Sequence, residues 1–187
     1  MAMPTDIIAD SDLIAHFKVK ELKEQAFTQL VKKYQERLYW HIRRMVVVHE
    51  DAHDILQNVF IKVWRHMEGF RADSNLYTWL YRIATNETLT WIESNKKNNH
   101  QALGDSESGF SSELKAEKGY DARQIEWRLQ QAIQTLPDKQ RIVFNLRYYD
   151  EMPYEEMSTV LDTSVGALKA SYHHAAKKVE NILINGL

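Results

Sequence analysis

The segment from Asp51 to Trp91 constrains the fold more than any other part of the chain. Apolar residues recur there at three- and four-residue steps, the spacing that places side chains on one face of an α-helix. The first such pattern ends at Gly69 and the second begins near Thr78. The apolar positions of the first are Ala52, Leu56, Val59, Phe60, Val63 and Met67, and those of the second are Leu80, Ile83, Ala84 and Trp91. Two consecutive amphipathic helices are therefore predicted.

A short polar turn is predicted between these helices, over Phe70–Tyr77. Its aspartate, serine and asparagine are residue types that favour irregular backbone. A further helical pattern precedes the pair, from Leu13 to Val48. Its expected core positions are Phe17, Phe27, Leu30, Val31, Tyr34, Leu38 and Ile42. The first half of the chain is thus expected to be helical.

The C-terminal third has the layout of a helix-turn-helix. Helices are predicted over Gln124–Leu136 and Arg141–Tyr149. A further helix is expected to open at Pro153, because proline suits the first positions of a helix. The three-residue turn Asp162–Ser164 then leads into a long helix, Val165–Leu183. A helix, a tight turn and a second helix form the arrangement that many DNA-binding proteins place in the major groove.

The chain has 187 residues and no cysteine, which excludes disulfide bonds and thiolate metal sites. No apolar run approaches the roughly 20 residues that a helix needs to span a bilayer. The first residues, MAMPTDIIADSDLI, carry acids rather than the basic start of a signal peptide. We therefore expect a cytoplasmic protein without membrane insertion.

Net charge limits the ways in which this chain could bind DNA. It carries 24 Lys and Arg residues against 26 Asp and Glu, a formal net charge of −2. Proteins that bind DNA unaided usually present a basic face, since the release of counterions from phosphates supplies most of the non-specific affinity. The chain is poorly equipped for DNA binding on its own.

Two motifs, in order along the chain, resemble the bacterial sigma factors. D-A-x-D-x-x-Q-x-V-F, a tryptophan and then F-R-x-x-S-x-L-x-T-W-L-Y-R-I-A-x-N resemble region 2. L-P-D-K-Q-R-x-V-F-x-L-R-Y-Y, Y-E-E-M and S-V-G-A-L-K-A-S resemble region 4. The extracytoplasmic-function (ECF) group, which keeps only these two regions, is the most similar. The resemblance implies an all-α fold with two small helical domains, at residues 1–97 and 124–187, joined by a flexible acidic linker at 98–123.

The resemblance also implies a function without catalysis or cofactor: binding core RNA polymerase and directing it to promoters. In the first domain it implies docking on the clamp coiled coil of the largest polymerase subunit and capture of the opened −10 promoter element. The residues matched to the polymerase contact are Asp54, Gln57, Asn58, Ile61 and Trp64. Those matched to the −10 element are Phe70, Arg71, Ser74, Asn75, Tyr77, Arg82, Asn86 and Thr90.

For the second domain, the resemblance implies contact with the flap of the second-largest subunit and with the −35 element. An anti-sigma factor is the further partner implied. The residues matched to −35 DNA are Ser164, Gly166, Ala167, Lys169, Ala170, His173, His174 and Lys177. The chain departs from the family at Ser171, His174 and Ala176, where arginines are common, and this weakens direct readout of guanine. Asp162 stands in place of the usual turn glycine but can still adopt left-handed backbone.

Three alternatives remain open from the residues alone. A stand-alone helix-turn-helix regulator would use only the C-terminal third, and an adaptor would bind polymerase without reading DNA. A zinc hydrolase is suggested by His49-Glu50-Asp51-Ala52-His53, which spells H-E-x-x-H. That motif needs both histidines on one helix face and a third ligand. We expect His49 to lie in a loop before the helix, where it could not share a face with His53.

Overall fold

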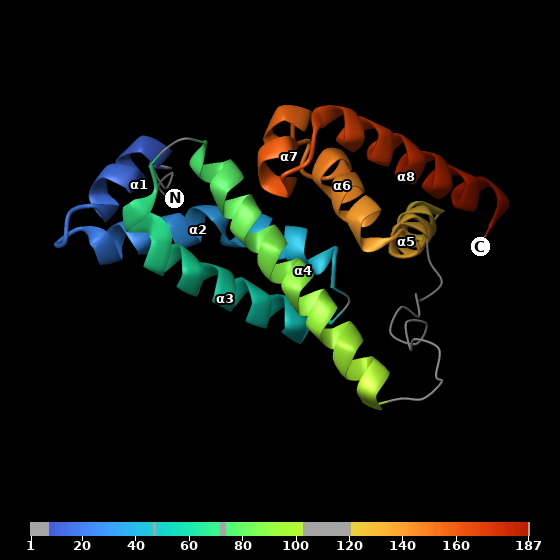
Figure 1. Ribbon diagram of the computed structural model, residues 1–187, viewed down its shortest axis with the longest axis horizontal. Helices are drawn as coiled ribbons and strands as arrows, with labels where there is room; N and C mark the ends of the chain where they lie inside the picture. The colour runs from blue at the N-terminus through green and yellow to red at the C-terminus, as the bar shows by residue number, and fades with distance from the viewer. Residues whose placement is uncertain (1–7, 47, 72–73, 103–120, 187) are drawn as a thin grey trace. The chain divides into compact units, whose positions relative to one another are not determined.

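The computed structural model describes residues 8–46, 48–71, 74–102 and 121–186, and within them all regular structure is helical (Figure 1). The prediction of an all-α fold is confirmed. The chain divides into two compact units whose main boundary lies inside α4, between Ile92 and Glu93, with Thr159–Leu161 grouped with the first unit. The elements are α1 (Asp10–Phe17), α2 (Lys23–Arg43), α3 (His49–His66), a 3₁₀ turn η1 (Met67–Gly69), α4 (Leu76–Ala102), α5 (Asp121–Gln134), α6 (Asp138–Tyr148), α7 (Tyr154–Leu161) and α8 (Val165–Asn185).

In the first unit, α2 packs against both α1 and α3 (Figure 1). The first half of α4 contacts α3 through the ion pair of Glu87 with Lys62. Leu30, Leu38 and Ile42 on α2 are completely buried. The ring of His41 on α2 is also fully buried and hydrogen-bonds to the hydroxyl of Thr85 on α4 at 3.0 Å. Burial of an apolar stripe from each helix therefore builds one core, which fixes the orientation of α3 and the start of α4.

The buried face of α3 differs from the predicted one at Ile55, Leu56 and Phe60. Ala52, Ile55, Val59 and Val63 are buried, whereas Leu56 and Phe60, which the sequence predicted as core, are only half-buried. Leu56 follows another apolar residue, so the helical period alone cannot decide which member of the pair faces the core.

The turn between α3 and α4 is shorter than predicted. The backbone N–H of Trp79 donates to the carbonyl of Asn75 at 3.0 Å, and α4 begins at Leu76. Tyr77 therefore lies in the helix rather than in the turn. The buried side chain of Leu76 explains the difference, because its contact with the core extends the helix towards its N-terminus.

In the second unit, α8 packs against α5 and α6 (Figure 1). The core cluster consists of Ala132, Ile133, Leu136, Phe144, Ala175 and Val179. Asp162, between α7 and α8, has φ 49° and ψ 48°, which confirms the left-handed conformation expected for it. This residue ends α7 and lets the chain turn into α8 within three residues, as a helix-turn-helix requires.

Helical structure also enters both ends of the segment predicted as a linker. The linker was predicted to begin at residue 98, but α4 continues to Ala102, and α5 begins at Asp121 rather than at Gln124. No glycine or proline interrupts the chain before Gly104, which explains the extension of α4. Residues 103–120 lie outside the described part of the chain, so the domain boundaries remain predictions.

Candidate functional surfaces

Three polar side chains and one isoleucine form an exposed stripe on α3. Asp54, Gln57, Asn58 and Ile61 all face solvent on the side opposite the buried residues of this helix. Ile61 is 42% exposed and supplies the apolar surface among the three polar side chains. We call these four residues the α3 stripe. An apolar centre with a polar rim is the usual composition of a protein–protein contact surface.

Trp64, the fifth residue predicted to bind polymerase, lies in a different environment. Its half-buried ring packs edge-on against Phe17 of α1 at 5.5 Å and against Phe27 of α2 at 5.0 Å. The ammonium group of Lys23 lies 4.6 Å from the centre of the same ring. These contacts join α1, α2 and α3, so Trp64 stabilises the fold whether or not its exposed surface also contacts a partner.

The turn before α4 combines a buried aromatic pair with exposed polar groups. Phe70 is 6% exposed, and its ring centre lies 5.1 Å from that of the half-buried Trp79. Arg71 and Asn75 are exposed and Ser74 is half-buried. Phe70 therefore supports the turn from below, while the polar residues form its outer surface.

A polar face continues along α4 from this turn. Arg82, Asn86 and Thr90 are all exposed and recur at four-residue steps, each a rise of about 6 Å along one side of the helix. Tyr77, near the start of the same helix, is half-buried with its ring centre 4.4 Å from that of Tyr81. We call Arg82, Asn86 and Thr90 the α4 row.

The N-terminal half of α8 presents every residue that was matched to −35 DNA. All of them are exposed: Ser164, Gly166, Ala167, Lys169, Ala170, His173, His174 and Lys177. Leu168, Ala175 and Val179 face the core from the opposite side. The hydroxyl of Ser164 caps the helix by accepting a hydrogen bond from the N–H of Ala167 at 3.3 Å.

Neighbouring cations on α8 differ in what they contact. The ammonium group of Lys178 donates to the carbonyl of Thr135 at 3.0 Å, so it is bound to the turn that follows α5. Lys169 lies over the ring of Tyr154 on α7, 5.6 Å from its centre, and Lys177 is exposed. Lys169 and Lys177 are consequently the better placed of the three for DNA phosphates.

The sequence-based prediction for His49 is wrong. Val48 is the N-cap residue of α3, in an extended conformation, so His49 is the first residue of the helix and shares a face with His53. Glu50 and Asp51 favour this earlier start, because acids stabilise the first turn of a helix. Within the described residues, however, no three His, Cys, Asp or Glu side chains are grouped closely enough to hold a metal ion. The third ligand that a hydrolytic zinc site needs is therefore not among them.

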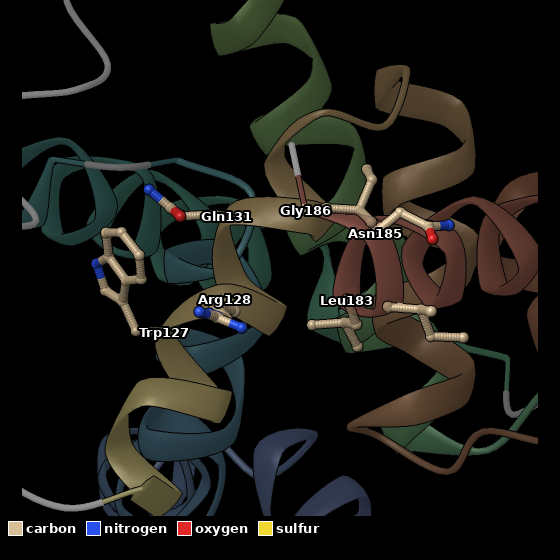
Figure 2. Close-up of a pocket in the computed structure, with 8 residues that line it drawn as sticks. Trp127, Arg128, Gln131, Leu183, Asn185 and Gly186 are labelled. Atoms are coloured by element: carbon tan, nitrogen blue, oxygen red, sulfur yellow. The ribbon is translucent and has the colours of Figure 1, made fainter.

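A pocket of about 410 Å³ opens between α5 and the C-terminal end of α8 (Figure 2). Trp127 and Arg128 line it from α5, and Leu183 and Asn185 line it from α8. Arg128 is the only ionisable side chain among the described residues that line it, so these residues supply no acid–base pair. None of the helices among the described residues is long and apolar enough to cross a membrane.

Two helical units, one with an exposed stripe on α3 and one built around a helix-turn-helix, place this chain among the helix-turn-helix proteins. Residues 30–98 match the family described as Sigma-70 region 2, and residues 126–179 match Sigma-70, region 4. The chain is 31% identical to the RNA polymerase sigma-H factor of Pseudomonas aeruginosa, over 89% of this chain and 90% of the relative. It is 30% identical to the ECF RNA polymerase sigma-E factor of Escherichia coli, over 91% of this chain and 93% of the relative. The chain belongs to the ECF group of the sigma-70 family of transcription initiation factors.

Solved structures of low sequence identity share the fold. CnrH, determined in complex with the cytosolic domain of CnrY, has a TM-score of 0.68 at 22% identity and matches 95% of this chain and 98% of its own. The sigma factor RpoE of Bartonella quintana, determined with the anti-sigma factor NepR, also has a TM-score of 0.68, at 18% identity, over 86% of this chain and 98% of its own.

Proposed function

We propose that this sigma factor binds core RNA polymerase through the α3 stripe and directs it to promoters through α4 and α8. The observation that carries the proposal is the position of the stripe: four exposed residues on a helix whose other face is fully anchored in the core. A rigid helix that presents an exposed isoleucine among hydrogen-bonding side chains suits a preformed partner surface. The clamp coiled coil of the largest subunit is the partner that the family suggests.

The turn before α4 and the α4 row would hold the opened −10 strand. Extracting a base from the stack costs a few kcal/mol, which hydrogen bonds to the base edge and stacking must offset. Arg71, Ser74 and Asn75 offer the hydrogen bonds. Phe70 acts from beneath, since its ring is buried against Trp79 and holds the turn in place.

The exposed face of α8 would contact the −35 duplex, while its unit docks on the flap of the second-largest polymerase subunit. Lys169 and Lys177 supply phosphate contacts, and His173 and His174 can reach base edges. With a net charge of −2, the chain depends on polymerase for most of its affinity for DNA. An anti-sigma factor that restrains this protein in the cytoplasm completes the proposal, in line with the complexes of CnrH and RpoE.

Pull-down with core polymerase tests the central proposal. The double variant Asp54→Arg/Gln57→Ala should lose most of its binding, because it places a cation and a truncated side chain at the centre of the stripe. Glu36→Arg, an exposed charge reversal on α2, is the matched control and should bind like the unaltered chain. Undiminished binding by the double variant would contradict the proposal that the α3 stripe binds the clamp coiled coil.

An adaptor that binds polymerase without reading DNA is the second candidate. It is favoured by one observation, the presence of Ser171, His174 and Ala176 where family members commonly carry arginine. Run-off transcription with core enzyme separates the two functions. A sigma factor yields transcripts from selected promoters, whereas an adaptor yields none beyond those of core enzyme alone.

A further inference from the structure

Two histidines at the start of α3 and Tyr39 on α2 form a cluster of ring side chains that belongs neither to the α3 stripe nor to the α4 row. His49 and His53 lie one helical turn apart on α3, and both are exposed. Their Nε2 atoms are 3.1 Å apart. Tyr39 of α2 lies beside them, and its hydroxyl is 2.6 Å from Nδ1 of His49.

The distance between the two Nε2 atoms is close to that imposed by a shared metal ion. Two imidazole nitrogens on one tetrahedral Zn²⁺, each at about 2.0–2.1 Å, lie about 3.3 Å apart. In a square-planar arrangement, which Cu²⁺ and Ni²⁺ favour, the same bond lengths place them about 2.9 Å apart. The observed 3.1 Å falls between these values. The separation of the two nitrogens therefore suits either geometry.

Tyr39 orients the pair. Its ring centre lies 5.7 Å from that of His49 and 5.0 Å from that of His53, so it packs against both imidazoles. When Nδ1 of His49 carries the proton and donates it to the Tyr39 hydroxyl oxygen, Nε2 of His49 keeps its lone pair for a ligand. Such a hydrogen bond to the non-coordinating nitrogen is the usual support of a metal-binding histidine.

We propose that His49 and His53 together bind a divalent first-row transition-metal ion of the kind that prefers imidazole, namely Zn²⁺, Ni²⁺ or Cu²⁺. Water completes the coordination, since no third His, Cys, Asp or Glu joins the pair among the described residues. A ligating nitrogen must offer its lone pair, so each ring would bind the ion as the tautomer protonated at Nδ1, and a proton held on either Nε2 would leave to solvent.

A site with two protein ligands exchanges its ion readily and does not resemble a hydrolytic or structural zinc centre, which holds three or four. Because imidazole affinities follow the order of the first-row metals, Cu²⁺ should bind most tightly. The site depends only on α2 and α3, and it stands whether or not the α3 stripe contacts polymerase.

A second pair of histidines in the chain serves as a control for metal binding by exposed imidazoles that do not face each other. His173 and His174 are both exposed on α8, but they are adjacent in sequence and point about 100° apart around the helix. Their ring centres are 5.9 Å apart. The double variant His173→Ala/His174→Ala removes as many imidazoles as His49→Ala/His53→Ala without touching the proposed site.

Calorimetric titration of the full, untagged chain with ZnCl₂ and with NiCl₂, in a non-coordinating buffer, tests the proposal. We expect one site, at least tenfold weaker in His49→Ala or His53→Gln and unchanged in His173→Ala/His174→Ala. Tyr39→Phe should weaken it less than loss of either histidine. Circular dichroism checks that each variant is folded.

A second measurement locates the ion. Substoichiometric Cu²⁺ should broaden the NMR signals of Tyr39, His49 and His53 before those of His173 and His174, because paramagnetic relaxation acts only at short range. Equal affinity in the unaltered chain and in His49→Ala/His53→Ala would overturn the proposal. So would broadening that begins on α8.

Discussion

Ile61 and Trp64 lie less than one turn apart on α3, yet their side chains contribute to different properties of the protein. Ile61 is 42% exposed, so its removal takes little apolar surface out of the core. Trp64 joins α1, α2 and α3 through its contacts with Phe17 and Phe27. Ile61 is therefore suited to binding a partner, whereas Trp64 stabilises the packing of the three helices.

This contrast predicts opposite effects of two alanine substitutions. Trp64→Ala should lower the free energy of unfolding by about 2–4 kcal/mol, because a cavity replaces a half-buried aromatic ring. Ile61→Ala should change it by less than about 0.5 kcal/mol, as expected for a surface site. Urea denaturation measures both values, and pull-down with core polymerase should show the greater loss for Ile61→Ala. Equal stability of the two variants would contradict the assignment.

Tyr34 provides a second prediction for a single residue. Its hydroxyl lies 2.8 and 2.7 Å from the two carboxylate oxygens of Asp10, and the ring is 5% exposed. Burial, followed by the hydrogen bond to Asp10 and its negative charge, raises the pKa of Tyr34 well above its ordinary value near 10. At alkaline pH the unfolded chain therefore releases a proton that the folded chain retains.

Stability should consequently fall as the pH rises above about 10, the ordinary pKa of tyrosine, whereas this group should add no pH dependence near neutral pH. Tyr34→Phe should remove part of that fall, at the expense of about 1–3 kcal/mol at pH 7 through the lost hydrogen bond to a charged group. Unfolding in urea at pH 7 and pH 11 measures both effects. Tyr148→Phe, at an exposed tyrosine, is the control. An unchanged pH dependence in Tyr34→Phe would refute the assignment.

At the scale of the elements, Asp162 determines how α8 is presented. Its left-handed backbone, with φ 49°, turns the chain between α7 and α8. Asp162→Gly should be tolerated, whereas Asp162→Val should destabilise the second unit by about 1–2 kcal/mol, since a β-branched residue is strained at positive φ. Amide exchange on α7 and α8 measures the difference within this unit. Equal protection in both variants would show that the turn is not strained.

The same elements show what could be predicted from sequence and why. Periodicity predicted the helices and the turn at Asp162, because both follow from local backbone preferences. It placed the start of α4 two residues late, since burial of Leu76 depends on other helices. The family resemblance grouped Trp64 with the residues of the α3 stripe, because the motif cannot show that rings from α1 and α2 cover this side chain. The pairing of His49 with Tyr39 was missed for the same reason.

For the whole molecule, a net charge of −2 predicts that this chain adds only a few phosphate contacts to the affinity of polymerase for DNA. Lys169→Ala/Lys177→Ala should weaken promoter binding by the complex with core polymerase alike for all sequences, and should lower the slope of log affinity against log salt by about 1–2. Lys178→Ala should leave the slope unchanged, because that ammonium group is bound to the carbonyl of Thr135. Fluorescence anisotropy across a salt series, on a promoter selected with the assembled enzyme, measures the slopes. If Lys178→Ala lowered the slope as much as the double variant, these contacts would have to be reassigned along α8.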